Sequence, residues 1–129
     1  MQIVIDSRSE RPVYMQIIDH IKREIALGRL HPGDQLPTIR QLAQQLVINP
    51  NTIAKAYRYL EQEGLLSTRP GGGSFVSELS SRLSDSAKKE IVCNFLKQAA
   101  VEAVLFKVES SVFRRWFEEV LKMYKYDVE

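Results

Sequence analysis

Residues 36–76 of this 129-residue chain read LPTIRQLAQQLVINPNTIAKAYRYLEQEGLLSTRPGGGSFV, and most of the fold can be predicted from them. The first half of this stretch predicts two helices. Thr38 is an expected N-cap with Gln41 completing a capping box, and Asn49 is an expected N-cap with Pro50 in the first helical position. The expected buried stripes are Ile39, Leu42, Ala43 and Leu46 in the first helix, and Ile53, Ala56, Tyr57 and Leu60 in the second. Only a few residues separate the two helices, which is the spacing of a helix-turn-helix.

The second half of the stretch predicts a β-hairpin. Gly64 is placed to end the preceding helix, and the expected strands are Leu65 to Thr68 and Ser74 to Ser77. The tip is RPGGG, because proline cannot donate to a strand ladder and glycine accepts a positive φ. Three consecutive glycines also suggest the phosphate loop of a nucleotide enzyme. A P-loop needs G-x-x-x-x-G-K-[ST], however, and this stretch has neither that spacing nor the lysine, so the hairpin is favoured.

A further helix and an arm are expected on the N-terminal side. Residues 3–5 (Ile-Val-Ile) predict a short strand or an extended arm. A helix is expected after Pro12 and is placed to end at Gly28. Its apolar positions recur at spacings of three and four: Tyr14, Ile17, Ile18, Ile21 and Ile25. LHPGDQLP, residues 30–37, is a turn-rich connection to the helix-turn-helix.

On the C-terminal side the serine-rich SELSSRLSDS, residues 77–86, suits a linker or a helix lead-in. A long helix is expected from about Ser86 to Phe106 and a second from about Ser111 to Tyr126. The broad apolar face of the long helix is expected to comprise Ile91, Val92, Phe95, Leu96, Ala99 and Ala103. The predicted fold is therefore mainly α with a small β-wing: a winged helix-turn-helix over residues 1–78, then a two-helix extension over residues 79–129.

Composition narrows the function classes without choosing one. With 44% apolar residues the chain has enough for a core, and its net charge is +2, shared almost evenly between the two halves. Nucleic-acid binding must therefore rest on where the charges lie. The chain has no uncharged apolar run of about 18 residues and no signal-peptide pattern, so we expect a cytoplasmic protein without a membrane partner. The lone Cys93 and the separated His20 and His31 favour no metal site.

Function is expected at the start of the second helix of the helix-turn-helix. In such a motif this helix enters the major groove, and short amides and hydroxyls at its N-terminus bond bases or phosphates, where free backbone N–H groups also favour anions. Asn49, Asn51 and Thr52 lie in this turn, followed by Lys55 and Arg58. The alternative is that Asn49 is only a cap and Arg58 only a solvated charge.

An arginine and two tyrosines near this turn are also assigned from their positions. Arg40, on the preceding helix, is expected to clamp the DNA backbone. Tyr57 shares the face of the buried residues and is expected in the core, whereas Tyr59 points elsewhere, toward solvent or DNA.

The residues just described resemble a known family. Together with PVYMQIIDHIKREIALGRLHPGDQ, residues 12–35, the stretch is similar to the winged-helix domain of the GntR transcriptional regulators over residues 11–77. The LP-[ST]-x-R-x-LA element of that family is Leu36 to Ala43, and the NPNT-x-x-KAY form with a short C-terminal extension is similar to the YtrA subfamily.

The resemblance implies roles for particular residues. It implies that Arg40 contacts phosphate, that Asn49, Asn51, Thr52 and Lys55 contact bases or backbone, and that the wing glycines enter the minor groove. Arg69 lies beside these glycines, where a cation can follow them into the groove. The expected DNA-binding residues are Thr38, Arg40, Asn49, Asn51, Thr52, Lys55, Arg58, Arg69, Gly71, Gly72, Gly73 and Ser74. Pro50 and Ala54 stand where the fatty-acid-responsive branch often has arginines, so the base-reading scheme of that branch does not transfer.

The C-terminal extension is expected to form a homodimer. About 50 residues in two helices cannot enclose a sizeable metabolite pocket, so we expect no enzyme domain and no cofactor, and leave a small-molecule effector open. The aromatic residues of these helices expose more apolar surface than a lone helical hairpin can bury, and the YtrA subfamily that the chain resembles is dimeric. The expected dimerisation residues are Phe95, Phe106, Phe113, Trp116, Phe117 and Val120. The alternative is that these helices pack on the winged helix of the same chain.

The favoured function is a sequence-specific DNA-binding transcriptional regulator, a repressor that binds double-stranded operator DNA of palindromic sequence as a homodimer. The alternative is a winged-helix protein-interaction module without a DNA target. A recognition helix lacking Lys and Arg favours that alternative, and this helix carries Lys55 and Arg58.

Overall fold

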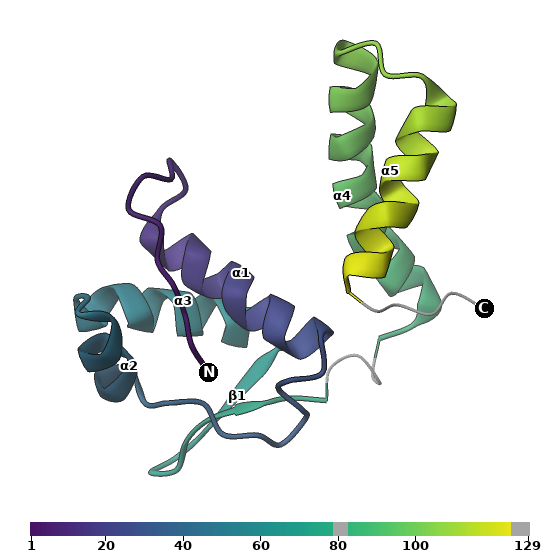
Figure 1. Cartoon of the computed structure of the whole chain (residues 1–129). Coiled ribbons are helices and arrows are strands. Elements are labelled where there is room, and N and C mark those ends of the chain that lie inside the picture. The colour runs from purple at the N-terminus through teal and green to yellow at the C-terminus, as the bar shows by residue number, and fades with distance from the viewer. Residues whose placement is uncertain (79–82, 125–129) are drawn as a thin grey trace. The chain divides into compact units, whose positions relative to one another are not determined.

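Two compact units, Met1–Leu79 and Ser80–Glu129, make up the chain in the computed structural model, which describes residues 1–78 and 83–124 (Figure 1). The elements of the first unit are, in order, α1 (Val13–Ala26), α2 (Ile39–Leu46), α3 (Pro50–Gln62), β1 (Leu66–Arg69) and β2 (Gly73–Val76). Those of the second are α4 (Asp85–Leu105) and α5 (Ser110–Met123). The predicted class, mainly α with a small two-stranded β-wing, is confirmed.

The core of the first unit lies where α1 and α2 pack against α3 (Figure 1). Its most deeply buried large side chains are Ile17, Ile21, Leu42, Ile53 and Leu60. Each contributes about 1.5–3 kcal/mol through the removal of its side chain from water. Leu66 and Val76, which are paired across the hairpin, extend this core toward the wing. The same buried side chains therefore set the position of α3 relative to the wing.

Residues 3–5 form an extended arm and not a strand. Ile3 is buried in the core. The side-chain amide of Gln16 on α1 makes hydrogen bonds with both backbone groups of Asp6, the residue that follows the arm. Its Oε1 accepts a hydrogen bond from the backbone N–H of Asp6 at 2.8 Å, and its Nε2 donates to the carbonyl oxygen of Asp6 at 3.0 Å. The arm is thus held in place by the buried side chain of Ile3 and by the side-chain amide of Gln16.

The wing strands begin and end one residue away from the predicted positions. Gly64 ends α3 with a φ of 80°, and the N–H of Leu65 donates back to the carbonyl oxygen of Leu60 at 2.9 Å. Leu65 therefore belongs to the closing turn of the helix, and β1 starts at Leu66. The antiparallel register runs from Leu66 opposite Val76 to Arg69 opposite Gly73.

The predicted stripe of α2 needs a correction at its first residue. Leu42 and Ala43 are buried as expected, but Ile39 is 37% exposed. The reason lies upstream, because Leu36 is only 2% exposed and fills the core at this end of the helix. Leu46 is half-buried.

The second unit is a pair of helices lying side by side (Figure 1). Ser84 caps α4 by accepting a hydrogen bond from the N–H of Ala87 at 3.1 Å, so this helix starts one residue earlier than predicted. The start of α5 is likewise one residue earlier, and Tyr126, its predicted end, lies outside the described residues. Lys107 makes the turn between the helices with a φ of 56°.

Apolar residues of α4 are not confined to the single predicted face. At about 100° per residue, Val92 and Val101 lie on opposite sides of Ala100, which is half-buried beside α5. Both valines are more than half exposed. No described residue of α4 or α5 is buried, so this pair of helices exposes apolar surface on two flanks.

Candidate nucleic-acid interface

The backbone N–H groups in the first turn of α3 make hydrogen bonds within that turn. Asn49 Oδ1 accepts a hydrogen bond from the N–H of Asn51 at 2.8 Å, and the carbonyl oxygen of Asn49 accepts from the N–H of Thr52 at 3.0 Å. Pro50 has no N–H. The expectation of free backbone N–H groups in this turn is therefore wrong at these positions. The donor that this turn can still offer to DNA is a side-chain group. Asn49 uses only its Oδ1 in the cap, and its Nδ2 makes no hydrogen bond to a described residue.

The outward face of α3 carries three of the predicted DNA-binding residues. Asn51, Lys55 and Arg58 are exposed and follow one another at spacings of four and three, which places them on one side of a helix. The opposite side is the buried stripe. Thr52 is half-buried at the edge of the outward face. The structure thus presents two cations and an amide together.

The two tyrosines of α3 separate as predicted. Tyr57 is 4% exposed and its hydroxyl donates a hydrogen bond to the carbonyl oxygen of Pro37 at 2.7 Å. Burial raises the pKa of this hydroxyl far above its ordinary value. Tyr59 is 42% exposed, and a hydrogen bond to Glu63 raises the pKa of its hydroxyl.

The N-terminus of α2 is closed by the predicted capping box. Thr38 Oγ1 accepts from the N–H of Gln41 at 3.0 Å, and Gln41 Oε1 accepts from the N–H of Thr38 at 2.9 Å. Thr38 and Arg40 are both exposed. The hydroxyl proton of Thr38 is not used by the cap, and Arg40 makes no ion pair with any residue in 1–78 or 83–124.

The wing tip is a tight turn whose glycines have different roles. The N–H of Gly72 donates to the carbonyl oxygen of Arg69 at 2.9 Å. Gly71 and Gly73 have φ values of 71° and 87°, a region that side chains rarely adopt, whereas Gly72 does not. Two of the three glycines are therefore required by the backbone, and the third is not.

The segment before α2 holds the wing in place, which the sequence did not indicate. Gln35 Nε2 donates to the carbonyl oxygen of Gly72 at 3.1 Å, and Gln35 also forms an isolated β-bridge with Phe75. The N–H of Leu36 donates to the carbonyl oxygen of Ser74 at 2.9 Å. Ser74, a predicted DNA-binding residue, is half-buried in this arrangement. Gln35 is a long-range partner, and no local sequence signal identifies it.

Most of the unneutralised positive charge of the first unit lies on predicted site residues. Three of the nine cations in residues 1–78 pair with carboxylates: Arg11 with Asp19, Lys22 with Glu63, and Arg29 with Glu24. The six cations that make no ion pair with a described carboxylate are Arg8, Arg23, Arg40, Lys55, Arg58 and Arg69. Four of these six were predicted to contact DNA from the helix-turn-helix and the wing. The overall charge of the chain hides this distribution.

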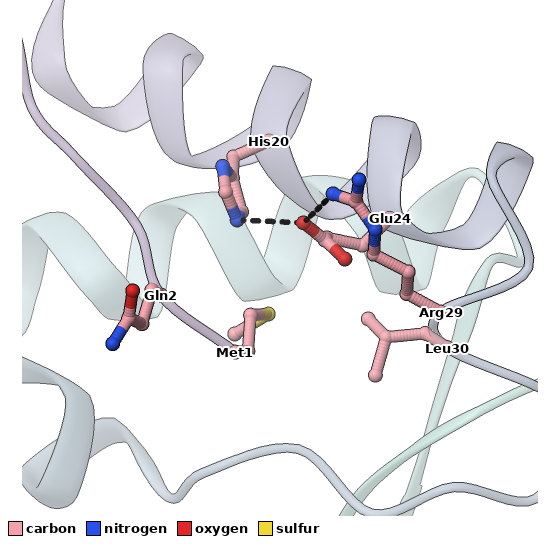
Figure 2. Close-up of a pocket in the computed structure, with 6 residues that line it drawn as sticks. All are labelled: Met1, Gln2, His20, Glu24, Arg29 and Leu30. Carbon is pink, nitrogen blue, oxygen red and sulfur yellow. Dashed lines mark hydrogen bonds and ion pairs between the residues drawn. The ribbon is translucent and has the colours of Figure 1, made fainter. Parts of the chain in front are cut away.

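A separate polar hollow of about 440 Å³ lies beside the C-terminal half of α1 and is lined by Met1, Gln2, His20, Glu24, Arg29 and Leu30 (Figure 2). Glu24 is 8% exposed, a burial that the sequence did not predict. Its Oε1 accepts a hydrogen bond from Arg29 at 3.2 Å and lies 3.4 Å from Nε2 of His20, a contact that is an ion pair only when the ring is protonated (Figure 2).

The groups in this hollow mainly close the end of α1. The N–H groups of Arg29 and Leu30 donate to the carbonyl oxygen of Glu24 at 2.9 and 3.1 Å. Burial lowers the pKa of His20, although the charge of Glu24 acts in the opposite direction. None of the predicted DNA-binding residues lines the hollow. Among the residues that the structure describes, no group of three or more His, Cys, Asp or Glu side chains is arranged to hold a metal ion.

Comparison with known proteins assigns the motif. The model of the family described as "Bacterial regulatory proteins, gntR family" matches residues 13–76. The chain is 38% identical over 118 residues to the HTH-type transcriptional repressor YtrA of Bacillus subtilis, covering 92% of this chain and 91% of that protein. The relatives are transcriptional regulators.

Solved structures agree with this match. A transcriptional antiterminator from Listeria monocytogenes superposes with a TM-score of 0.86 at 28% identity, over 100% of this chain and 98% of that one. The DNA-binding domain of AraR in complex with operator ORX1 superposes with a TM-score of 0.53 at 31% identity, over 60% of this chain and 96% of that one. Within residues 1–78 and 83–124 no helix has the length and apolar character needed to cross a membrane.

Proposed function

Since the chain belongs to the GntR family of bacterial regulatory proteins and is a DNA-binding transcriptional regulator, we propose that it acts as a repressor that binds a palindromic operator as a homodimer. The proposal takes residues 1–78 as the DNA-binding domain and residues 79–129 as the dimerisation extension. Because its target is the chromosome, the protein acts in the cytoplasm. Repression is supported by the relative that is named a repressor over nearly the same length.

One observation carries the DNA site. Arg40, Lys55, Arg58 and Arg69 are exposed and free of carboxylate partners among the described residues. Cations in this state release counterions when they meet phosphates, which is the main source of affinity for duplex DNA. In the proposed complex, the outward face of α3 enters the major groove, Arg40 meets a phosphate and the wing enters the minor groove.

The N-terminal turn of α3 supplies the base contacts in this proposal. The side-chain amide of Asn51 is exposed, and an asparagine matches the paired donor and acceptor edge of adenine. Asn49 contributes its Nδ2 while its Oδ1 keeps the helix capped. Thr38, Thr52 and Ser74 add hydroxyl contacts to the backbone. Gly71, Gly72 and Gly73 let the wing tip approach the groove closely.

Dimerisation is supported by the exposure of α4 and α5. Phe95 and Phe106 are 63% and 72% exposed, and Trp116, Phe117 and Val120 are also exposed. Phe113 is half-buried, and it lines a groove between the two helices together with Leu96, Ala100, Arg114 and Phe117. A second copy supplies the same apolar surface through a two-fold axis, and this axis pairs two recognition helices with two half-sites of a palindrome.

The DNA site is tested by comparing binding to the protein's own promoter region with binding to random duplex at moderate salt. Arg40→Ala is expected to weaken binding about equally on all sequences, whereas Asn51→Ala is expected to reduce the preference for the promoter. Arg23→Ala is the matched control, because Arg23 is also exposed and without an ion pair but lies on α1 outside the proposed site. Equal affinity of the unmodified protein for promoter and random DNA contradicts the proposal and favours an interaction module without a DNA target.

The dimer is tested by sedimentation of Phe95→Glu and Phe106→Glu, with Lys88→Glu as an exposed polar control on the same helix. The two Phe variants are expected to sediment as monomers and to lose operator affinity, while Lys88→Glu remains dimeric. A wild-type protein that is monomeric at concentrations where it binds its operator contradicts this part of the proposal.

A further inference from the structure

Two cations of the proposed DNA site rest on aromatic rings. The ammonium of Lys55 on α3 lies 4.0 Å from the centroid of the Tyr14 ring on α1. The guanidinium carbon of Arg69 on the wing lies 4.1 Å from the centroid of the Phe75 ring on the facing strand. Neither cation has a carboxylate partner among the described residues.

An aromatic ring holds a cation without removing its charge. The negative face of the ring attracts the cation, but the pair keeps a net charge of +1. A carboxylate also holds a cation, but it cancels the charge, and a phosphate must first displace it. A lysine held on a ring has already lost part of its rotamer freedom, so less entropy is lost when it meets a phosphate.

Lys22 provides the contrast within the same pair of helices. Its ammonium lies 5.7 Å from the centroid of the Tyr59 ring, but it is also 3.3 Å from a carboxylate oxygen of Glu63. Lys22 is therefore neutralised, whereas Lys55 is held by a ring alone. Lys22 therefore stabilises the fold through its ion pair, whereas Lys55 keeps a charge that can attract an anion.

Tyr14 is itself fixed by the fold. It lies in the first turn of α1, is half-buried and packs against the hydrophobic core. Lys55 is exposed on the outward face of α3. The packing of α1 on α3 thus sets the position of a charged group whose side chain is exposed on α3.

We propose that Tyr14 and Phe75 are positioning residues of the DNA site, which hold Lys55 and Arg69 in place, still charged, to meet phosphates of the duplex backbone. The inference rests on the proposed function of these two cations. It assigns roles to two aromatic residues that belong neither to the helix-turn-helix surface nor to the wing tip.

The test is a double-mutant cycle on operator affinity. Tyr14→Leu removes the ring while keeping apolar volume, and it is expected to weaken binding roughly two- to fivefold. Tyr14→Phe keeps the ring and is expected to retain the affinity of the wild type. In a Lys55→Ala background, Tyr14→Leu is expected to have no further effect, because Tyr14 acts through Lys55. Phe75→Leu is expected to behave in the same way with respect to Arg69.

The salt dependence separates positioning from contact. Lys55→Ala is expected to reduce the slope of log affinity against log salt by about one, because a phosphate contact is lost. Tyr14→Leu is expected to leave this slope unchanged, because Lys55 still reaches its phosphate in the complex. Lys22→Ala is the control, and it is expected to change neither affinity nor slope.

Nuclear magnetic resonance of the free protein gives a readout that does not depend on DNA. The side-chain resonances of Lys55 next to the ammonium are expected to be shifted upfield by the Tyr14 ring, to stay shifted in Tyr14→Phe and to return in Tyr14→Leu. Equal losses of affinity for Tyr14→Leu with and without Lys55, or a loss for Tyr14→Phe as large as for Tyr14→Leu, overturn the proposal. An upfield shift with no effect of Lys55→Ala on affinity or slope shows instead that the DNA role of Lys55 is wrong.

Discussion

The buried hydroxyl of Tyr57 on α3 donates a hydrogen bond to the carbonyl oxygen of Pro37, 2.7 Å away. Pro37 directly precedes Thr38, the N-cap of α2. This one bond therefore connects the recognition helix to the point where the preceding helix begins, close in sequence to Arg40. It fixes the relative placement of two parts of the proposed DNA site from inside the core.

Tyr57→Phe is expected to reduce the free energy of unfolding by about 1–2 kcal/mol, because the carbonyl oxygen of Pro37 is left without its partner while the ring still packs. Chemical denaturation near neutral pH measures this change. Tyr59→Phe is the control, since the hydroxyl of Tyr59 is exposed and its loss is expected to cost less. Equal stability of Tyr57→Phe and the wild type contradicts the structural role given to this bond.

His20 is expected to make stability depend on pH on the acid side of neutrality. Burial lowers its pKa in the folded chain below the ordinary value of 6.5, so the unfolded chain takes up a proton first. The contribution of neutral His20 to the free energy of unfolding is complete above the ordinary pKa of 6.5, and it is lost as the pH falls through the lower pKa of the folded chain. Arg23 and Arg29 act in the same direction as burial, and Glu24 opposes it.

Denaturation midpoints measured at about pH 7.5 and about pH 5.5 test this prediction. The wild type is expected to lose more stability between these two values than His20→Gln does. A loss that is the same in both proteins assigns the pH dependence to other groups.

Val47 is expected to be a site where substitution stabilises the protein. It is the C-cap of α2, in the turn of the helix-turn-helix, with a φ of 54°. A β-branched residue is strained in this left-handed region, and the Val47 side chain is 89% exposed, so it contributes little packing. Val47→Gly is therefore expected to raise the free energy of unfolding by about 1 kcal/mol, with unchanged operator affinity.

Val47→Ala keeps a Cβ atom and removes only the branch, so a smaller gain than that of Val47→Gly is expected. Thermal denaturation compares the three proteins. A destabilised Val47→Gly variant contradicts the assignment of strain, and a loss of operator affinity indicates that the exposed valine contacts DNA.

The wing glycines are expected to separate folding from DNA binding. A Cβ atom on Gly72 meets the Cβ atom of Arg69 at 3.3 Å, a close contact, but its φ is not strained, so Gly72→Ala is expected to cost less stability than a substitution at a glycine with a positive φ. Gly72→Glu adds a negative charge at the tip and is expected to weaken operator binding about tenfold without unfolding the protein.

Gly73→Ala provides the comparison, because Gly73 has a φ of 87° and a Cβ atom there meets Nε2 of Gln35 at 3.0 Å. This variant is expected to lose about 1–2 kcal/mol of stability. Circular dichroism and operator affinity are measured together for all three variants. If Gly72→Glu keeps full operator affinity, the three glycines only form the turn of the hairpin and do not contact DNA.

Local features of the first unit were predictable because caps and turns are encoded within a few residues. The capping box of Thr38 and Gln41, the Asn49 cap and the end of α3 at Gly64 all follow from short-range chemistry. The burial of Tyr57 followed from its position on the apolar stripe.

Features that depend on distant partners were not predictable. The ring of Tyr14 meets Lys55, and Gln35 meets the wing, only after the chain has folded. The burial of Glu24 also depends on the path of the loop that follows α1.

In the proposed complex, two copies of this chain read a palindrome through α3 and the wing. The most direct test is to sequence the DNA enriched from a random duplex pool by the purified full-length protein. We expect one enriched motif made of two inverted half-sites, with their centres about one helical turn or somewhat more apart. The motif is expected to lose base preference at particular positions in the selection repeated with Asn51→Ala. If no sequence is enriched, or if the enriched motif lacks two-fold symmetry, the chain does not read a palindrome as a homodimer.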